Sequence, residues 1–328
     1  MKRIALVGYG YWGPNLLRNF YETADCEVLY VCDNDLIRLK DVRKRYPSIM
    51  LTGSFDDVLR DSEVDAVVIA VPTKYHFEIA KKSIASGKDV LIEKPMTITS
   101  KEAEALNEFA AKNKRIVMVD HTFLFTEAVR KLKKIIDAGT LGRIIYIDSV
   151  RVNLGLVQKD SNVIFDLATH DVSILKYLLD KDPDRVSAEG HSYFGKQEEI
   201  SYLHLHYPGG VSANIHVSWL SPLKIRRMMI VGTKKMAVYD DIEQSEKIKL
   251  YDKGIEMDKT QVRIGYRSGD VHSPNLEIKE GLSTMSGEFI KSIEKREEPV
   301  SSGRFGLAVV KVLEEASKSI KNANSKKR

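Results

Sequence analysis

Long apolar runs are missing from this sequence, and cysteine is scarce. No stretch approaches the roughly 20 apolar residues of a membrane-spanning helix, so we expect no membrane partner. The two cysteines, Cys26 and Cys32, lie about 20 Å apart at strand rise, too far to form a disulfide. The chain starts with Met1-Lys2-Arg3 and enters a strand at once. We therefore expect no signal peptide and a reduced, cytoplasmic protein.

A large excess of one charge is also missing. Lysine and arginine number 51 against 46 acidic residues, a net charge of +5. Basic runs such as residues 131–134 lie on predicted helices without interleaved aromatic side chains, unlike a nucleic-acid surface. We expect no nucleic-acid partner, whereas the mildly positive surface favours anionic small substrates.

A glycine-rich motif is the first positive feature. The apolar run 4–7 leads into G-x-G-x-x-G, with a helix predicted to follow. The first glycine allows a tight turn, the second lets a pyrophosphate approach the backbone, and the third lets the helix pack on the strand. The phosphates then lie at a helix N-terminus. The predicted contacts are Gly8, Gly10, Tyr11, Trp12 and Gly13.

An acidic residue follows at the spacing that a dinucleotide site requires. The predicted strand 26–32 ends at Asp33, twenty positions past Gly13, with Asn34 beside it. A carboxylate there binds the ribose hydroxyls of NAD and repels the 2′-phosphate of NADP. NAD is favoured, although Arg38 and Arg43 on the next helix leave NADP open. The alternative is that the glycines form a plain turn and Asp33 a strand end.

Strands and helices alternate through the first third of the chain. The strands 65–71 and 89–92 are continuously apolar, which is typical of strands buried on both faces in a parallel sheet. Helices are predicted at 12–22, 36–45 and 75–86, and another begins with Ser100 as its N-cap. A further strand follows at 116–119. The sequence predicts an α/β fold with a doubly wound parallel sheet over residues 1–120.

The alternation of strands and helices ends at about residue 121. Between 185 and 251, strands follow one another with turns such as 208–210, which indicates an antiparallel meander. We predict a second, α+β domain over 121–328 with an open, mostly antiparallel sheet, and a last helix that packs back on the first domain. The other predicted elements are helices 126–138, 285–295 and 305–321, a helix from about 166, a strand at 143–153 and a frayed tail at 322–328.

Residues just past the carboxyl ends of parallel strands are candidates for chemistry. We expect Pro72, Thr73 and His76, which follow the strand 65–71, to contact the cofactor. Glu93 and Lys94 follow the strand 89–92. A lysine there can hydrogen-bond a substrate hydroxyl or act as a base. The alternative is a surface lysine paired with Glu93.

A second candidate group lies in the predicted α+β domain. Asp166 and His170 are four residues apart, so on a helix they share one face. A carboxylate beside an imidazole orients the ring and raises its proton affinity, which gives an acid–base group. Asp166 as an N-cap with a surface His170 is the alternative. Arg151 and Asn153 are candidate substrate contacts, unless they are ordinary residues of a sheet face.

Taken in order, these motifs resemble the Gfo/Idh/MocA family of NAD(P)-dependent sugar and polyol oxidoreductases. The resemblance extends over nearly the whole chain. It rests on G-x-G-x-x-G at 8–13, Asp33, Pro72-x-x-x-His76, Glu93-Lys94-Pro95 and Asp166-x-x-x-His170.

The resemblance implies a Rossmann domain followed by a mixed domain whose open sheet forms the oligomer interface, hence a homodimer or homotetramer. It implies that Lys94 and His170 flank the reacting carbinol and that Asp166 binds substrate or orients His170. Glu93 and His76 would contact the nicotinamide half of the cofactor. The peptide before the proline of Glu-Lys-Pro is commonly cis in this motif.

Two segments depart from the family pattern. Residues 162–164 read Asn-Val-Ile where a glycine-rich approach is common, and residues 121–125 read His-Thr-Phe-Leu-Phe where many relatives have Asn and Arg. The segments 10–15 and 166–171 look most like the branch acting on nucleotide sugars. That branch oxidises the 3-hydroxyl of UDP-N-acetylglucosamine or its uronic acid with NAD.

Other functions stay open at this point. An inositol or free-sugar dehydrogenase would carry the same motifs, and a non-catalytic nucleotide sensor would need the glycine loop without the proton-handling pair. His204, His206 and His216 share one strand face if 208–210 is a three-residue loop. Because no cysteine or acid lies near them in the sequence, we expect polar strand positions and no metal.

Overall fold

Two compact units make up the protein. The computed structural model describes residues 1–155, 161–257, 264–277 and 279–325. Unit 1 comprises Met1–Phe125 and Lys279–Lys311, and unit 2 comprises Thr126–Ile278 and Val312–Arg328. The long helix α9 (Gly303–Ser325) belongs to unit 1 in its first part and to unit 2 in the rest. The sequence analysis placed the boundary between the two domains at residue 120. In the structure, residues 279–311 also belong to unit 1.

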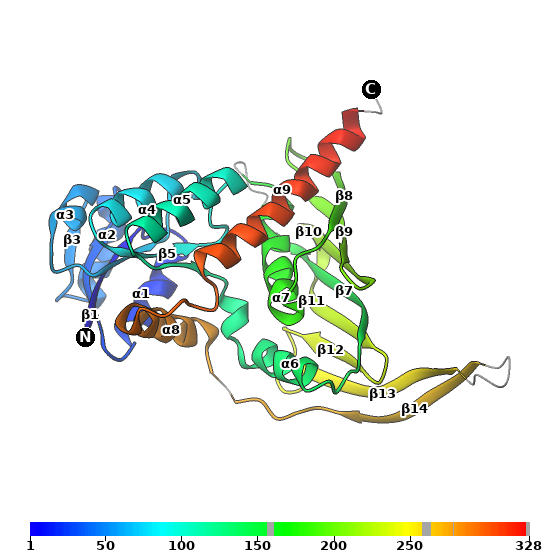
Figure 1. The fold of residues 1–328 in the computed structure, drawn as a ribbon. Helices are drawn as coiled ribbons and strands as arrows, with labels where there is room; N and C mark the ends of the chain where they lie inside the picture. Colours follow the sequence, from blue (N-terminus) through cyan, green and yellow to red (C-terminus); the bar gives the residue numbers. More distant parts are fainter. Residues whose placement is uncertain (156–160, 258–263, 278, 326–328) are drawn as a thin grey trace. The chain divides into compact units, whose positions relative to one another are not determined.

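Unit 1 is built on a six-stranded parallel sheet with the order β3-β2-β1-β4-β5-β6 (Figure 1). The predicted doubly wound parallel sheet is confirmed. The order reverses between β1 and β4, the switch point at which open α/β sheets bind ligands. The strands are β1 (Lys2–Val7), β2 (Cys26–Cys32), β3 (Met50–Thr52), β4 (Ala66–Ile69), β5 (Asp89–Glu93) and β6 (Val117–Asp120).

Helices lie on both faces of this sheet (Figure 1), and the inner residues of its central strands are apolar. All four residues of β4 are buried. Phe20 of α1 meets Phe289 of α8 edge to face, with ring centroids 6.2 Å apart. The helices are α1 (Gly13–Tyr21), α2 (Leu36–Arg45), α3 (Phe55–Arg60), α4 (His76–Ala85), α5 (Ser100–Lys112) and α8 (Gly281–Lys295), with 3-10 turns η1 (Thr73–Tyr75) and η2 (Thr122–Phe125).

The N-cap of α5 lies one residue earlier than predicted. Thr99 Oγ1 accepts a hydrogen bond from the Glu102 amide, and Glu102 Oε2 accepts one from the Thr99 amide, both at 3.2 Å. This reciprocal capping box requires Thr or Ser three residues before Glu. Thr99 satisfies that spacing, whereas Ser100, the predicted cap, lies inside the helix.

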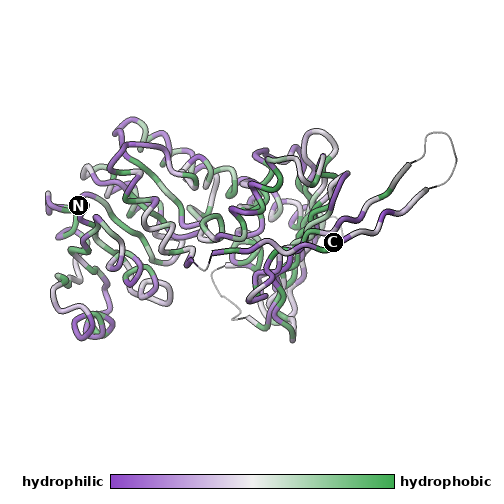
Figure 2. Tube along the Cα trace, turned by 90° about the horizontal axis from the view of Figure 1, so that it is seen from below, coloured by the Kyte–Doolittle hydropathy of each residue, from purple (hydrophilic) through white to green (hydrophobic). Residues whose placement is uncertain are grey.

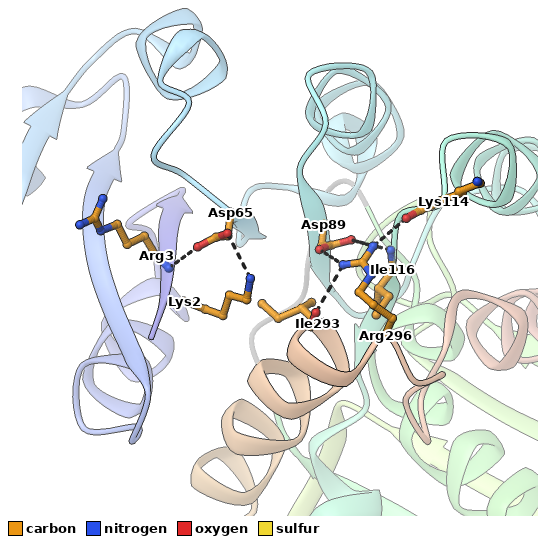
Figure 3. A network of polar contacts seen from close by, with 8 residues as sticks. All are labelled: Lys2, Arg3, Asp65, Asp89, Lys114, Ile116, Ile293 and Arg296. Carbon is orange, nitrogen blue, oxygen red and sulfur yellow. Dashed lines mark hydrogen bonds and ion pairs between the residues drawn. The ribbon is translucent and has the colours of Figure 1, made fainter.

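The segment 279–311 is tied to β5 and β6 of the sheet in unit 1. Arg296, at the end of α8, binds the Asp89 carboxylate at 2.6 and 3.1 Å and donates to the Lys114 carbonyl at 2.6 Å (Figure 3). On the strand neighbouring β5, the Val119 amide donates to the Ser301 carbonyl at 2.8 Å. These contacts make the segment an integral part of the Rossmann unit.

Unit 2 contains an eight-stranded, mostly antiparallel sheet with the order β14-β13-β12-β11-β7-β10-β9-β8. Alternating burial along β9 shows that one face of the sheet is covered. The strands are β7 (Ile144–Leu154), β8 (Arg185–His191), β9 (Ile200–Tyr207), β10 (Val211–Ser218), β11 (Leu220–Gly232), β12 (Met236–Asp240), β13 (Ile248–Met257) and β14 (Ile264–His272). The helical segments are α6 (Glu127–Asp137), the π-helical turn η3 (Ile164–Ala168) and α7 (Thr169–Leu179).

The meander prediction is correct for most of this sheet and wrong at its centre. Strand β7 lies between β10 and β11 and pairs with β10 in parallel. Adjacent strands in the sequence need not be neighbours, because an earlier strand can insert between them. The turn 208–210 is a three-residue loop, since Tyr207 pairs with Val211.

The hairpin of β13 and β14 projects beyond the rest of the sheet (Figures 1 and 2). Strand β12 pairs with β13 only as far as Tyr251, and the rest of β13 pairs with β14 alone. The sequence analysis did not predict β14, because Gly265 and Gly269 interrupt it and its apolar residues do not alternate. No helix among the described residues is both long and apolar enough to cross a membrane.

Candidate active site

The glycine loop between β1 and α1 has the geometry expected of a dinucleotide site. Gly8 has a φ of +99°, and a Cβ there would lie 2.5 Å from the Ala70 carbonyl oxygen. A Cβ on Gly13 would lie 2.5 Å from the Gly8 carbonyl oxygen. The nearest atom to a Cβ on Gly10 is Arg38 Nη1 at 3.7 Å. The fold itself thus requires two of the glycines, while Gly10 leaves room for a ligand to approach the backbone.

The N-terminus of α1 is open for an anion. Within the described part of the chain no side chain caps this helix, and Pro14 occupies its first turn. The first N–H groups of a helix have no partner inside the helix and attract negative charge. Tyr11 and Trp12 precede the helix, with Tyr11 90% exposed and its ring stacked on that of Trp12.

Asp33 lies buried at the end of β2, where the loop orients its carboxylate. Oδ2 accepts a hydrogen bond from the Tyr9 amide at 2.6 Å, and Oδ1 accepts one from the Asp35 amide at 2.8 Å. A carboxylate has about four acceptor positions, so these two bonds leave acceptor capacity for ribose hydroxyls. Asn34, next to it, is exposed.

The structure distinguishes Arg38 from Arg43, the two arginines considered as partners for the 2′-phosphate of NADP. Arg38 Nη1 is 3.6 Å from Asp33 Oδ2, so its guanidinium lies beside the predicted ribose site. Arg43 Nη1 donates instead to the Pro47 carbonyl at 3.2 Å, at the far end of α2. Of the two, Arg38 alone is placed beside Asp33.

The segment after β4 contains three predicted cofactor contacts. Pro72 is exposed and Thr73, in η1, is half-buried. His76 is buried, with Nδ1 3.0 Å from the Pro95 carbonyl oxygen and Nε2 2.8 Å from that of Val71. Burial lowers the pKa of His76. The two ring nitrogens thus contact main-chain carbonyl groups in the segments after β4 and β5. The resemblance implied that this side chain contacts the nicotinamide.

Two acidic side chains meet where β5 and β6 end. Glu93 and Asp120 are register partners and both are buried. Burial raises the pKa of Glu93 well above its usual value, and the neighbouring carboxyl group of Asp120 adds to that shift. Thr122 Oγ1 donates to Asp120 Oδ1 at 2.5 Å. The neutral, protonated form of Glu93 is therefore favoured over its charged form beside Asp120.

Lys94 is half-buried at the same edge of the sheet, and the Lys94–Pro95 peptide is cis, as the resemblance implied. His121 follows β6, is buried, and packs against Phe305 with ring centroids 5.6 Å apart. Burial and the positive charge of Lys94 lower the pKa of His121 to about 3. A neutral imidazole thus lies within the electrostatic reach of the candidate catalytic lysine.

Asp120 and His121 are site candidates that the sequence analysis did not select. Asp120 ends β6 and His121 follows it, as Glu93 ends β5 and Lys94 follows it, and in a parallel sheet such ends lie side by side. The signal was present, since an acid and a histidine directly follow a buried strand.

Asp166 and His170 lie in unit 2, at a change of helix type. Asp166 is in the π-helical turn η3, and His170 is in the first turn of α7. Asp166 Oδ2 accepts a hydrogen bond from Trp219 Nε1 at 2.9 Å. The N-cap of α7 is Ala168, so Asp166 does not cap that helix. The π-helical turn alters the spacing that the prediction of a shared α-helical face assumed.

Arg151 and Asn153, the two predicted substrate contacts on β7, have different surroundings. Arg151 is buried, and its Nε and Nη2 donate to Asp171 at 2.7 and 3.3 Å. Ser149 Oγ donates to the same carboxylate at 2.8 Å. The structure thus gives Arg151 an ion pair with α7 in place of the expected substrate. Asn153, two residues further along β7, is half-buried.

The strand histidines of unit 2 have partners within the sheet. The ring of His216 stacks on Tyr202 at 4.4 Å, and His204 Nδ1 lies 2.8 Å from Asn214 Oδ1. His206 pairs with Ser212 on the same face. Across the described ranges, no group of three or more His, Cys, Asp or Glu residues could hold a metal ion.

Comparison with known families gives two matches along the chain. A profile described as the oxidoreductase family with NAD-binding Rossmann fold, Gfo/Idh/MocA, matches residues 2–121. The profile of the Gfo/Idh/MocA C-terminal domain matches residues 129–238. The residues in unit 1 that fit NAD are thus those of an NAD-binding domain.

Individual relatives are distant. A 1-carboxy-3-chloro-3,4-dihydroxycyclohexa-1,5-diene dehydrogenase of Comamonas testosteroni is 25% identical over 66% of this chain and 57% of its own length. The scyllo-inositol 2-dehydrogenase (NAD+) of Bacillus subtilis is 26% identical over 71% of this chain and 72% of its own. The UDP-N-acetylglucosamine 3-dehydrogenase GnnA of Acidithiobacillus ferrooxidans shares the fold, with a TM-score of 0.83 over 98% of both chains at 23% identity.

Proposed function

Because the chain belongs to the Gfo/Idh/MocA family of NAD-binding oxidoreductases, we propose that it is an NAD-dependent dehydrogenase of a nucleotide sugar. The reaction is oxidation of the 3-hydroxyl of UDP-N-acetylglucosamine or its uronic acid, or the reverse reduction. The observation that carries the proposal is the joint presence of an NAD-type loop and two candidate proton-handling groups. These are Lys94 after β5 and the Asp166–His170 segment.

The proposed roles follow from the chemistry of each residue. Bound NAD supplies the hydride acceptor. Asp33 binds the adenosine ribose, and the first turn of α1 binds the pyrophosphate. Lys94 hydrogen-bonds the substrate hydroxyl, and Lys94 or His170 takes or returns its proton. Asp166 binds the sugar or orients His170.

Lys94 has buried, polar surroundings that support such a role. Burial and the neighbouring Asp120 raise the pKa of Glu93, which disfavours a second negative charge at this edge of the sheet. Neutral His121 adds no positive charge next to Lys94. Burial thus disfavours the charged forms of both Glu93 and His121 beside Lys94.

A second candidate is oxidation of an inositol or free sugar. The sequence similarity to scyllo-inositol 2-dehydrogenase favours it, whereas the likeness to GnnA is one of fold. The resemblance of the segments 10–15 and 166–171 favours the nucleotide-sugar branch. Substrate turnover distinguishes the two candidates.

The test is NADH formation with NAD and a panel of UDP-sugars, inositols and free sugars, and with the 3-keto sugar nucleotide in reverse. Lys94→Ala and His170→Ala should each abolish most turnover while NADH binding, followed by its fluorescence, persists. Lys101→Ala and His191→Ala, both at exposed positions, are matched controls. Turnover of inositols alone would favour the second candidate. NAD binding without turnover of any compound in either direction would leave a nucleotide sensor.

We also propose that the open sheet of unit 2 joins subunits into a homodimer or homotetramer. The register places Tyr202, His216 and Val150 in one row across β9, β10 and β7. Tyr202 is 43% exposed, and Met229 on the same face is 37% exposed. Light scattering from the intact protein tests this assembly, and a monomer at all concentrations would contradict it.

A further inference from the structure

Trp219 lies where β10 passes into β11 and is almost completely buried, with 1% of its surface exposed. A buried indole N–H requires a hydrogen-bond partner. Its partner is Asp166 Oδ2, at 2.9 Å from Nε1. The bond connects two segments 53 residues apart in the sequence, one of which carries a candidate site residue.

The main chain holds Trp219 in place. Its amide donates to the Glu199 carbonyl, and its carbonyl accepts from the Gly155 amide, both at 2.9 Å. Gly155 also lies against the indole, because a Cβ there would be 2.8 Å from Trp219 Cδ1. The backbone bonds and the packing against Gly155 thus hold the indole ring, and with it the N–H donor, in a fixed position on the sheet.

The turn that carries Asp166 is fixed independently. Asn162 Oδ1 accepts from the Phe165 amide at 3.1 Å, and Asn162 Nδ2 donates to Glu198 Oε2 at 2.9 Å. The Asp166 amide donates to the Asn162 carbonyl at 3.1 Å. Asn162 thus holds the backbone of Asp166, and Trp219 holds its Oδ2 atom. Together these contacts fix the orientation of the carboxylate.

We propose that Trp219 is a positioning residue for the dehydrogenase reaction and acts through Asp166. The indole N–H occupies Oδ2 and so directs the remaining acceptor positions of the carboxylate. A charge-assisted bond of this kind is stronger and more directional than one between neutral groups. The inference rests on the proposed function, because Asp166 is a catalytic-site residue only there.

Trp219→Phe retains most of the buried ring and removes the N–H donor. We expect kcat to fall about 10- to 100-fold, the range of one hydrogen bond to a charged group. NADH binding should be unchanged, since it depends on unit 1. The matched control is Met228→Leu, a buried substitution in the same sheet, which should leave kcat within about twofold.

The deciding measurement is a double-mutant cycle with Asp166→Ala. If Trp219 acts through Asp166, Trp219→Phe should lower kcat in the native background and have little further effect on Asp166→Ala. If its role is only to support the fold, the two effects should multiply, which would overturn the inference. Should Trp219→Phe not fold, Gly155→Ala crowds the same indole and should show the same dependence on Asp166.

A separate measurement checks the contact without turnover. With Trp12 and Trp219 the only tryptophans, two indole N–H signals are expected by NMR, and Asp166→Ala should move one of them. An unmoved pair of signals would overturn the inference while leaving the dehydrogenase intact. If the native enzyme turns over no sugar in either direction, the proposed function fails and the positioning role fails with it.

Discussion

Substitutions at the buried ion pair of unit 2 should lower the free energy of unfolding by different amounts. Arg151 and Asp171 are both 3% exposed at their side chains, and three hydrogen bonds converge on the carboxylate. Removing one partner leaves an uncompensated buried charge, so Arg151→Met should cost about 3–5 kcal/mol. Ser149→Ala removes one bond to a charged group and should cost about 1.5–3 kcal/mol.

The double variant is more informative than either single one. Arg151→Met with Asp171→Leu removes both charges, and replacing a buried pair by apolar residues is often close to neutral. We expect it to be more stable than Arg151→Met alone. Lys133→Met, which breaks the more exposed pair with Asp137, is the control and should cost about 0.5 kcal/mol or less.

The assay is urea unfolding followed by tryptophan fluorescence in a Trp12→Phe background. The remaining Trp219 then reports on unit 2, which matters because a protein of two units need not unfold in one step. The reasoning is refuted if Arg151→Met lowers the free energy of unfolding no more than Lys133→Met does. It is also refuted if the double variant is less stable than Arg151→Met alone. The first result would mean that the pair is solvated, as a substrate-facing arginine would be.

Two further predictions concern unit 1. Gly10→Ala should weaken NADH binding with little change in the urea midpoint, whereas Gly8→Ala should lower the midpoint because its φ is +99° and its Cβ would meet the Ala70 carbonyl; equal midpoints for the two variants would contradict this. His121 stays neutral in the fold down to a pH of about 3, where its pKa lies, while an unfolded histidine binds a proton below about pH 6.5. The unfolded state therefore binds more protons in that window, and stability should fall as the pH falls. His121→Asn should reduce that fall, as urea midpoints at pH 7 and pH 5 would show; equal falls in both proteins would contradict it.

Local sequence patterns predicted the Rossmann unit because its signals act at short range. The glycine loop, the strand leading to Asp33 and the helix 36–45 depend on residues close to one another, and α2 has those bounds in the structure. The N-cap at Thr99 was missed by one residue because two hydroxyl residues stand side by side. Spacing to Glu102 distinguishes them once the capping box is considered.

Contacts between distant residues were not predictable in the same way. Nothing in the sequence near Arg151 indicates that Asp171 lies beside it, because the pair forms only when α7 packs on β7. The place of β7 between β10 and β11 depends on pairing across more than 60 residues. Likewise, the bond from Trp219 to Asp166 requires the finished sheet.

The membership of residues 279–311 in unit 1 has a consequence for synthesis of the chain. The ribosome makes residues 126–278 before the segment that supplies Arg296 to Asp89 and Phe289 to Phe20. At about 5–20 residues per second, the interval between residues 125 and 311 is roughly 10 to 40 s. Throughout that interval the first unit exposes the apolar surface that α8 later covers. The nascent dinucleotide-binding unit is therefore completed only when the end of the chain emerges.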